Sequence, residues 1–383
     1  MKKNVFTWAV LLIAVATCCA FSKTVSPQNN IRIAVLKDSF DFVVAIHGEY
    51  KIIDKATNQM LLHSRRLERS RVGAHNTGIY IGRRLYQTDH LSLESKKEVS
   101  IFVNNKKKQY RGRVDILKAK DGQLLVINVL DLETYIQGVL YHEITDKWPM
   151  EAMKAQAVAA RTYAYYQMQK NHEGLFDLTS DIYSQVYGGK SAERFRTNIA
   201  VRRTRGQVLM YQGNVLPAYF HSNSGGHTED VSELWEHDLP PLAGIVDQYA
   251  QGTPGYRWKR NYKSSDVQQK LNEKGFKIGA IKDMEVVERT KSGRVKMLKI
   301  IDRDGAQLMI TGKDFRSLIG PNDIRSLLFD VEMKGYYFDL MGKGWGHGVG
   351  MCQWGAYQMA KQRFNYDEIL EYYYPTAKLE KLP

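Results

Sequence analysis

The segment Asp131–Ile144 reads DLETYIQGVLYHEI, and from its first residue the hydrophobic spacing changes from two residues to about 3.6. Asp131 is a suitable N-cap, because a short acidic side chain accepts hydrogen bonds from the free N–H groups of a first helical turn. One helical face collects the apolar side chains of Leu132, Ile136, Val139 and Leu140. The pattern therefore predicts a helix over residues 131–144.

A second helix is predicted over residues 149–170. Pro149 suits a first helical turn, where the missing N–H costs no hydrogen bond. The residues that follow are rich in alanine, glutamine and methionine, which are good helix formers. Since only a short link separates the two segments, we expect a helical pair at the centre of the protein, with the active site on it.

Strands are predicted on both sides of this pair. Runs that are apolar or alternating, bounded by turn signals, are typical of strands. They occur at Ile31–Leu36, Phe42–Ile46, Val99–Val103, Arg113–Leu117, Leu124–Val129, Gly206–Tyr211, Leu216–Ser222 and Lys282–Ile310. The fold class predicted is therefore α+β, a mixed β-rich body around the helical pair. We expect an N-terminal β-rich region over 22–112 and a catalytic domain over 113–383. The N-terminal strands either form a separate domain or complete one sheet with the rest, and the sequence allows both.

The N-terminus has the pattern of an export signal. Lys2 and Lys3 precede an uncharged run from Val5 to Phe21, which is typical of a signal peptide over residues 1–21. A run of this length also allows an uncleaved membrane anchor, and Cys18 allows attachment of a lipid. Each alternative predicts that the rest of the chain works outside the cytoplasm, in contact with a membrane only through this segment.

Composition and charge narrow the class of partner. The 383 residues are 43% hydrophobic and 25% charged, which excludes a disordered or collagen-like chain. A formal net charge of +14 favours an anionic partner, and export excludes nucleic acid. Cys18, Cys19 and Cys352 are the cysteines, so neither a disulfide framework nor a cysteine-rich zinc site is expected.

Glu143 is the strongest candidate for a catalytic group. It falls on the apolar stripe of the first predicted helix and near the C-terminus of that helix. Loss of water and the partial negative charge of a helix C-terminus both raise the pKa of a carboxyl group. A carboxylic acid that stays protonated near neutral pH can protonate a glycosidic oxygen. The alternative is an ion pair between Glu143 and a buried lysine or arginine.

Other polar groups are open to two interpretations. Lys154 and Arg161 share a helical face, so they could bind ligand carboxylates, meet Glu143, or lie on a solvated flank. Ser224 lies in a polar glycine-rich cluster, but not in the Gly-x-Ser-x-Gly order of many serine hydrolases. His347 and Cys352 lie in a glycine-rich segment and could form a nucleophilic pair, although a lone cysteine is more often a buried small side chain.

Five stretches, in this order, resemble the stage II sporulation protein D family of peptidoglycan lytic transglycosylases. They are Leu132–Glu143, Trp148–Ala164, Ser184–Gly189, His221–Thr228 and Gly342–Ala356. The resemblance implies cleavage of the MurNAc–GlcNAc β-1,4 bond without water, which leaves a 1,6-anhydro-MurNAc end. It also implies a preference for strands whose stem peptides an N-acetylmuramoyl-L-alanine amidase has removed. The family also includes amidase modifiers, so a non-catalytic peptidoglycan-binding enhancer of an amidase is the alternative.

The resemblance assigns roles to individual residues. Glu143 corresponds to the catalytic acid and base. Substrate contacts are expected from Lys154, Arg161, Gln185, Tyr187, His221, Ser224, His347 and Gln353. For Lys154 and Arg161 we expect contacts with the lactyl carboxylates that removal of stem peptides exposes.

No cofactor and no metal are expected. Some family members hold zinc through cysteine and histidine near the stretch that contains Gln185. Here residues 179–184 read TSDIYS, which contains neither residue type. Cys352 stands where serine is common in the family, and His142 replaces a small residue beside the glutamate.

Overall fold

The N-terminal part of the computed structural model is built from two antiparallel sheets that share one hydrophobic core. The structure describes residues 30–181, 184–235 and 238–382, so the predicted signal segment lies outside the described residues. The strands of the first sheet are β1 (Asn30–Ser39), β3 (Tyr50–Asp54), β4 (Met60–Ser64), β8 (His90–Ser95), β11 (Arg113–Lys118), β12 (Leu124–Asp131) and β13 (Leu178–Thr179). Their order is β13-β1-β12-β11-β8-β3-β4, with β13 added parallel to β1.

The second sheet packs against the first, and its order is β10-β9-β2-β5-β6-β7. Its strands are β2 (Asp41–Ile46), β5 (Leu67–His75), β6 (Gly78–Ile81), β7 (Arg84–Tyr86), β9 (Val99–Val103) and β10 (Lys106–Tyr110). The three exposed lysines of residues 106–108 lie on the edge strand β10, where charge discourages pairing with other chains. The predicted boundary between residues 112 and 113 falls inside the first sheet, because β11 pairs with both β8 and β12.

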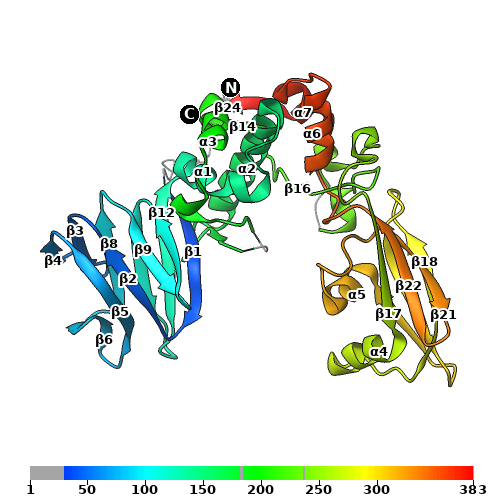
Figure 1. Ribbon diagram of the computed structural model, residues 1–383, viewed down its shortest axis with the longest axis horizontal. Coiled ribbons are helices and arrows are strands. Elements are labelled where there is room, and N and C mark those ends of the chain that lie inside the picture. Colours follow the sequence, from blue (N-terminus) through cyan, green and yellow to red (C-terminus); the bar gives the residue numbers. More distant parts are fainter. Residues whose placement is uncertain (1–29, 182–183, 236–237, 383) are drawn as a thin grey trace, which may run out of the picture.

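The central helices follow directly from β12. They are α1 (Leu132–Glu143), α2 (Met150–Lys170) and α3 (Phe195–Arg203), and they lie above the sheets in Figure 1. The predicted cap is present, because the Asp131 side chain accepts a hydrogen bond of 3.0 Å from the Thr134 N–H. Of the predicted apolar face of α1, Ile136, Val139 and Leu140 are buried in the core of the N-terminal sheets and Leu132 is partly buried. Tyr135, which was not predicted, is buried with them. This packing fixes the C-terminal end of α1, where Glu143 lies.

The C-terminal residues return to the central helices. Strands β14 (Gln207–Tyr211), β15 (Asn214–Val215) and β24 (Lys378–Lys381) form a small sheet. Helices α6 (Gln353–Lys361) and α7 (Tyr366–Tyr373) pack against α2. The short strands β16 (Phe220–His221) and β23 (Met351–Cys352) pair in parallel, which joins two segments that are far apart in the sequence.

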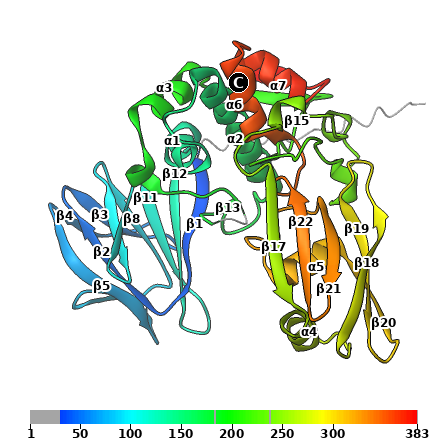
Figure 2. The same ribbon diagram turned by 45° about the vertical axis from the view of Figure 1, so that its right-hand side comes forward.

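Residues 257–343 form a separate lobe with its own core. One sheet consists of β17 (Arg257–Lys263), β21 (Phe329–Lys334) and β22 (Tyr337–Lys343), and another of β18 (Ile281–Arg289), β19 (Val295–Asp302) and β20 (Gln307–Thr311). Helices α4 (Ser264–Glu273) and α5 (Gly312–Ile319) complete the lobe. Figures 1 and 2 show this lobe and the N-terminal sheets on opposite sides of the central helices.

The predicted α+β class is confirmed, with a helical pair close to its predicted bounds. The segment predicted as a strand at Leu216–Ser222 contains only the short strand β16. None of the helices in the described ranges is both long enough and apolar enough to cross a bilayer.

Candidate active site

A cavity of about 380 Å³ opens at the C-terminal end of α1. Its walls come from α1, α2, the segment after β13, the region around β16 and the segment that leads into α6. The lining residues are Glu143, Tyr163, Ser184, Val186, Tyr219, Phe220, His221, Ser222, Trp235, Trp345, Gly346, His347 and Gln353. Four of the predicted site residues, Glu143, His221, His347 and Gln353, therefore meet in one cavity.

Glu143 is half-buried in this cavity and keeps few polar partners. Gln353 donates a hydrogen bond of 3.3 Å from Nε2 to Oε2 of Glu143. Loss of water raises the pKa of Glu143 to about 7, against the opposing effect of hydrogen bonds from Gln353 and from the main chain of Val186. No lysine or arginine in the described part of the chain forms an ion pair with Glu143. The carboxyl group can therefore be protonated or ionised near neutral pH.

The segment after β13 is held by two side chains that point away from the cavity. Gln185 accepts a hydrogen bond from the Tyr135 hydroxyl and donates one to the Ala160 carbonyl, at 3.1 and 3.2 Å. The Tyr187 hydroxyl donates to Oδ1 of Asn128 at 2.8 Å. Ser184 and Val186 line the cavity instead. Gln185 and Tyr187, predicted to contact substrate, are thus buried supports of the wall.

A close helix contact explains the glycine in the middle of α1. A Cβ atom on Gly138 would lie 2.5 Å from the ring of Tyr187. The Tyr187 ring also lies 5.1 Å from the ring of Tyr135. Gly138 therefore lets the supporting segment approach α1 closely. His142 lies on this side of the helix, next to Gly188, and does not line the cavity.

Aromatic side chains form the wall opposite the helices. The rings of Tyr219 and Trp235 are stacked, with 4.4 Å between centroids and 14° between planes. Trp345 also lines the cavity and is 39% exposed. Sugar rings pack well on exposed aromatic faces, which present apolar area next to polar groups. The sequence did not point to Trp235, which lies outside the five matched stretches, or to Tyr163, which lies inside one of them but carries no chemical signal of its own.

The two histidines of the cavity are neutral. Burial lowers the pKa of His347 to about 4, and Nδ1 of this ring accepts the Val349 N–H at 3.1 Å. Burial also lowers the pKa of His221 well below its usual value. Nδ1 of His221 lies 3.1 Å from the Val349 carbonyl oxygen, so Nδ1 carries the proton. These rings shape the wall and carry no charge at neutral pH.

Ser224 and Cys352 lie behind the cavity in a buried network. The Ser224 hydroxyl donates to Oδ2 of Asp247 at 2.7 Å. Burial and the nearby Asp247 raise the pKa of the Cys352 thiol well above its usual value. Cys352 Sγ accepts hydrogen bonds from the N–H groups of Ser224 and Gly355, each at 3.3 Å. A buried, protonated thiol of this kind is not an activated nucleophile.

The glycine-rich segment before α6 packs closely against β16, and this close approach requires glycine. Gly346 has a φ of 113°, and a Cβ atom there would lie 2.7 Å from Cβ of His221. Any larger residue at this position would be strained and would displace the histidine. The glycine thus lets Trp345 and His347 approach the cavity from the far end of the sequence.

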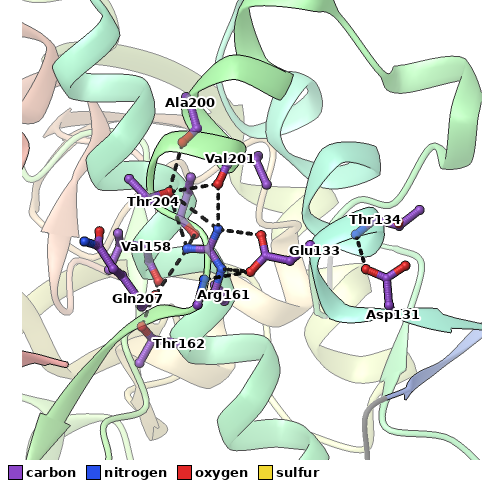
Figure 3. Close-up of polar contacts among 12 residues, drawn as sticks. Asp131, Glu133, Thr134, Val158, Arg161, Thr162, Ala200, Val201, Thr204 and Gln207 are labelled. Atoms are coloured by element: carbon purple, nitrogen blue, oxygen red, sulfur yellow. Dashed lines mark hydrogen bonds and ion pairs between the residues drawn. The ribbon is translucent and has the colours of Figure 1, made fainter. Parts of the chain in front are cut away.

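Arg161 is fully buried, away from the cavity, and its guanidinium group is saturated (Figure 3). It forms a two-pronged ion pair with Glu133, at 2.8 and 2.9 Å. It also donates to main-chain carbonyls of Ala157, Val201 and Gln207. In this structure Arg161 joins α1, α2 and α3, and it is not available to a substrate carboxylate.

Lys154 also has a structural partner. Its Nζ lies 2.7 Å from Oε1 of Glu151 and 4.9 Å from the ring centre of Tyr366. Glu151 in turn accepts the Tyr366 N–H at 3.1 Å. These contacts tie α2 to α7, and Lys154 does not line the cavity. Spacing on one helical face did not reveal which partners would surround each cation.

The segment that holds zinc in some family members is held here by hydrogen bonds. Oγ1 of Thr179 donates to Asp181 at 2.8 Å and lies 3.0 Å from the Ser184 hydroxyl. Its side chains supply neither thiolate nor imidazole, so they do not fit a zinc ion. In the described ranges no group of three or more His, Cys, Asp or Glu side chains is placed to hold a metal.

Comparison with known proteins places the chain among bacterial relatives. A family model described as "Stage II sporulation protein" matches residues 120–211, and a model for a domain of unknown function matches residues 239–350. An uncharacterized protein of Brachyspira hyodysenteriae is 32% identical over 91% of this chain and 92% of its own length. An amidase enhancer of Bacillus subtilis is 26% identical over 88% of this chain, which spans 51% of that protein.

One named relative decides the family. The stage II sporulation protein D of Bacillus amyloliquefaciens is 31% identical over 64% of this chain and 73% of its own length. The family model covers β12, the three central helices and Glu143. The chain belongs to the stage II sporulation protein D family.

Proposed function

We propose that this protein is a peptidoglycan lytic transglycosylase that cleaves the MurNAc–GlcNAc β-1,4 bond. The observation that carries the proposal is the half-buried Glu143, whose pKa is about 7, in a cavity with aromatic walls. A carboxylic acid with this pKa is partly protonated at neutral pH, which suits a general acid. The aromatic wall suits a sugar ring held beside it.

A single carboxyl group is sufficient for this reaction. Glycosidases that use water or a covalent intermediate need two carboxyl groups on opposite sides of the bond. Glu143 is the only acidic side chain among the described residues that line the cavity. An intramolecular nucleophile supplies what the second carboxylate would otherwise provide, and its effective concentration is high. The C6 hydroxyl of the MurNAc residue is such a nucleophile.

The proposed steps conserve protons at Glu143. The protonated carboxyl gives its proton to the glycosidic oxygen while the bond from C1 to that oxygen breaks. The resulting carboxylate then accepts the proton of the C6 hydroxyl as the oxygen bonds to C1. Glu143 returns to its acid form, and the products are a free GlcNAc hydroxyl and a 1,6-anhydro-MurNAc end. Gln353 holds the carboxyl group through its hydrogen bond in both states.

A second candidate function is non-catalytic enhancement of an amidase. The name of one relative, amidase enhancer, favours it, and the same cavity would then serve to bind glycan. In either case we propose that residues 30–383 act outside the cytoplasm, on peptidoglycan. Under the enzyme proposal, an amidase that removes stem peptides acts upstream. The buried thiol of Cys352 argues against a cysteine hydrolase.

Mass analysis of reaction products tests the proposal directly. Purified protein is incubated with amidase-treated peptidoglycan, and 1,6-anhydro-MurNAc ends are counted. We expect Glu143→Gln to release at least about a hundredfold fewer such ends, since general acid catalysis contributes roughly that much or more. The matched control is Glu371→Gln, an exposed glutamate on α7, which should behave like the natural sequence. Equal release by Glu143→Gln, or enhancement of an amidase without any release, would refute the enzyme proposal.

A further inference from the structure

A second cavity, of about 730 Å³, lies on the lobe formed by residues 257–343. It is lined by strands β17, β21 and β22 together with Arg289 and Leu328. Four cations contribute to its walls: Arg257, Lys259, Arg289 and Lys343. Figure 2 shows these three strands side by side below the central helices. The cavity belongs to a part of the chain that the proposed mechanism does not use.

Two of the four cations in the cavity wall, Lys259 and Arg289, are paired with neighbouring acids. Lys259 lies 2.9 Å from Asp339, and Arg289 lies 2.6 Å from Asp330. Lys334 lies 2.7 Å from Asp339. The pairs at Asp339 join neighbouring strands of one sheet, and the pair of Arg289 with Asp330 joins the two sheets of the lobe, so these charges have a structural explanation.

Arg257 and Lys343 differ from these cations. They are directly opposite each other in the register of β17 and β22, and both are exposed. Neither forms an ion pair with any residue that the structure describes. Like charges directly opposite each other destabilise a pair of strands. The fold therefore retains an unfavourable pair of positive charges in the wall of a cavity, as expected where an anion binds.

The pair adjoins the catalytic cavity. Only Gly344 separates Lys343 from Trp345, so the Cα atoms of Lys343 and Trp345 are at most about 7 Å apart. Trp345 lines the cavity that contains Glu143. The guanidinium carbon of Arg325 lies 4.6 Å from the centre of the Trp345 ring. Arg257, Lys343 and Arg325 together form a basic strip that begins at the aromatic wall of the active site.

We propose that the basic strip binds the lactyl carboxylates of a glycan strand whose catalytic segment lies against Glu143. This inference rests on the proposed function, because the glycan is its ligand. A strand that leaves the aromatic wall at Trp345 reaches Lys343 and Arg257 next. Lysine binds a carboxylate as a point charge, and arginine binds it with two parallel N–H donors. These residues, not Lys154 and Arg161, then select strands without stem peptides, in which the lactyl carboxyl group is free.

Binding measurements in the Glu143→Gln background test the inference, since a bound strand is then not cut. The ligands are amidase-treated glycan strands and neutral chitooligosaccharides of equal length. We expect Arg257→Gln and Lys343→Gln each to weaken binding of amidase-treated strands roughly two- to fivefold, and the double variant about tenfold. The loss should shrink at high salt, because exposed charges are screened. Affinity for the neutral oligosaccharide should not change.

The matched control is Lys263→Gln, which removes an exposed cation from the opposite end of β17. It should leave both affinities unchanged. Two results would overturn the inference: equal losses for charged and neutral ligands, or no loss for the double variant. Competition by inorganic phosphate as effective as competition by the strands would also overturn it, because the strip would then be a general anion site. Charge-dependent binding by a protein that releases no anhydro ends would refute the proposed enzyme and leave this inference standing.

Discussion

Replacing Glu143 by glutamine exchanges an ionisable side chain for a neutral one of nearly the same shape. The variant therefore isolates the cost of holding a carboxylate in the cavity. In the folded protein loss of water raises the pKa of Glu143 from 4.5 to about 7. Below pH 4.5 the carboxyl group is protonated in both the folded and the unfolded chain, so no cost arises. As the pH rises to about 7, the unfolded chain ionises first and the folded state loses stability.

The size of the effect follows from the two pKa values. A rise in pKa from 4.5 to about 7 corresponds to about 3 kcal/mol at a pH above both values. The cavity admits water to part of the half-buried carboxyl group, so we expect about 2 kcal/mol. As the pH rises from 4 to 8, the free energy of unfolding of Glu143→Gln should therefore rise by this amount relative to that of the natural sequence. In a chain of 383 residues that is a rise of roughly 2 to 3 °C in melting temperature.

Thermal melting of both proteins at several pH values between 4 and 8 measures the difference. The control Glu371→Gln should keep a constant offset from the natural sequence over the whole range. If the offset of Glu143→Gln were also constant, Glu143 would be as well solvated in the fold as in the unfolded chain. The argument for a general acid with a raised pKa would then fail, whatever the activity of the variant.

Two further predictions concern the buried Arg161 and the aromatic wall of the cavity. Arg161→Ala should destabilise the fold by about 3 to 5 kcal/mol, because it leaves Glu133 largely buried without its partner. An unchanged melting temperature together with weaker glycan binding would contradict this and would indicate that Arg161 contacts the substrate. Trp235→Ala should weaken glycan binding roughly tenfold by removing half of the stacked pair with Tyr219, and Trp235→Phe should retain most of the affinity. Calorimetric titration checks the second prediction, and unchanged affinity in Trp235→Ala would contradict the aromatic wall.

Local patterns in the sequence predicted the helical pair and the position of its acid. Asp131 caps α1 as expected, and the apolar stripe that contains Glu143 is the buried face of the helix. These features depend on residues within one or two helical turns, so spacing and capping preferences determine them. The raised pKa follows from the same stripe, because a carboxyl group on an apolar face loses water.

Features that depend on distant contacts were not predictable in the same way. Lys154 and Arg161 share a helical face, but the spacing could not show that Glu151 and Glu133 would neutralise them. Gln185 and Tyr187 lie in a matched motif, yet they support the wall from behind. Trp235 lines the cavity because the fold stacks it on Tyr219, a contact that no local pattern in the sequence indicates. The sequence alone did not show that β11 would pair with β8 across the predicted boundary at residue 112.

The hydrogen bond between Gln353 and Glu143 joins residues that are 210 positions apart. A ribosome would complete the acid-bearing helix long before the residues that enclose its carboxyl group were synthesised. Until then Glu143 would lack the hydrogen bond from Gln353 and the part of the cavity wall formed by Trp345, Gly346 and His347, so its carboxyl group would be more open to water. A chain cut short before residue 345 would therefore carry Glu143 without the residues from Trp345 to Gln353 that enclose its carboxyl group.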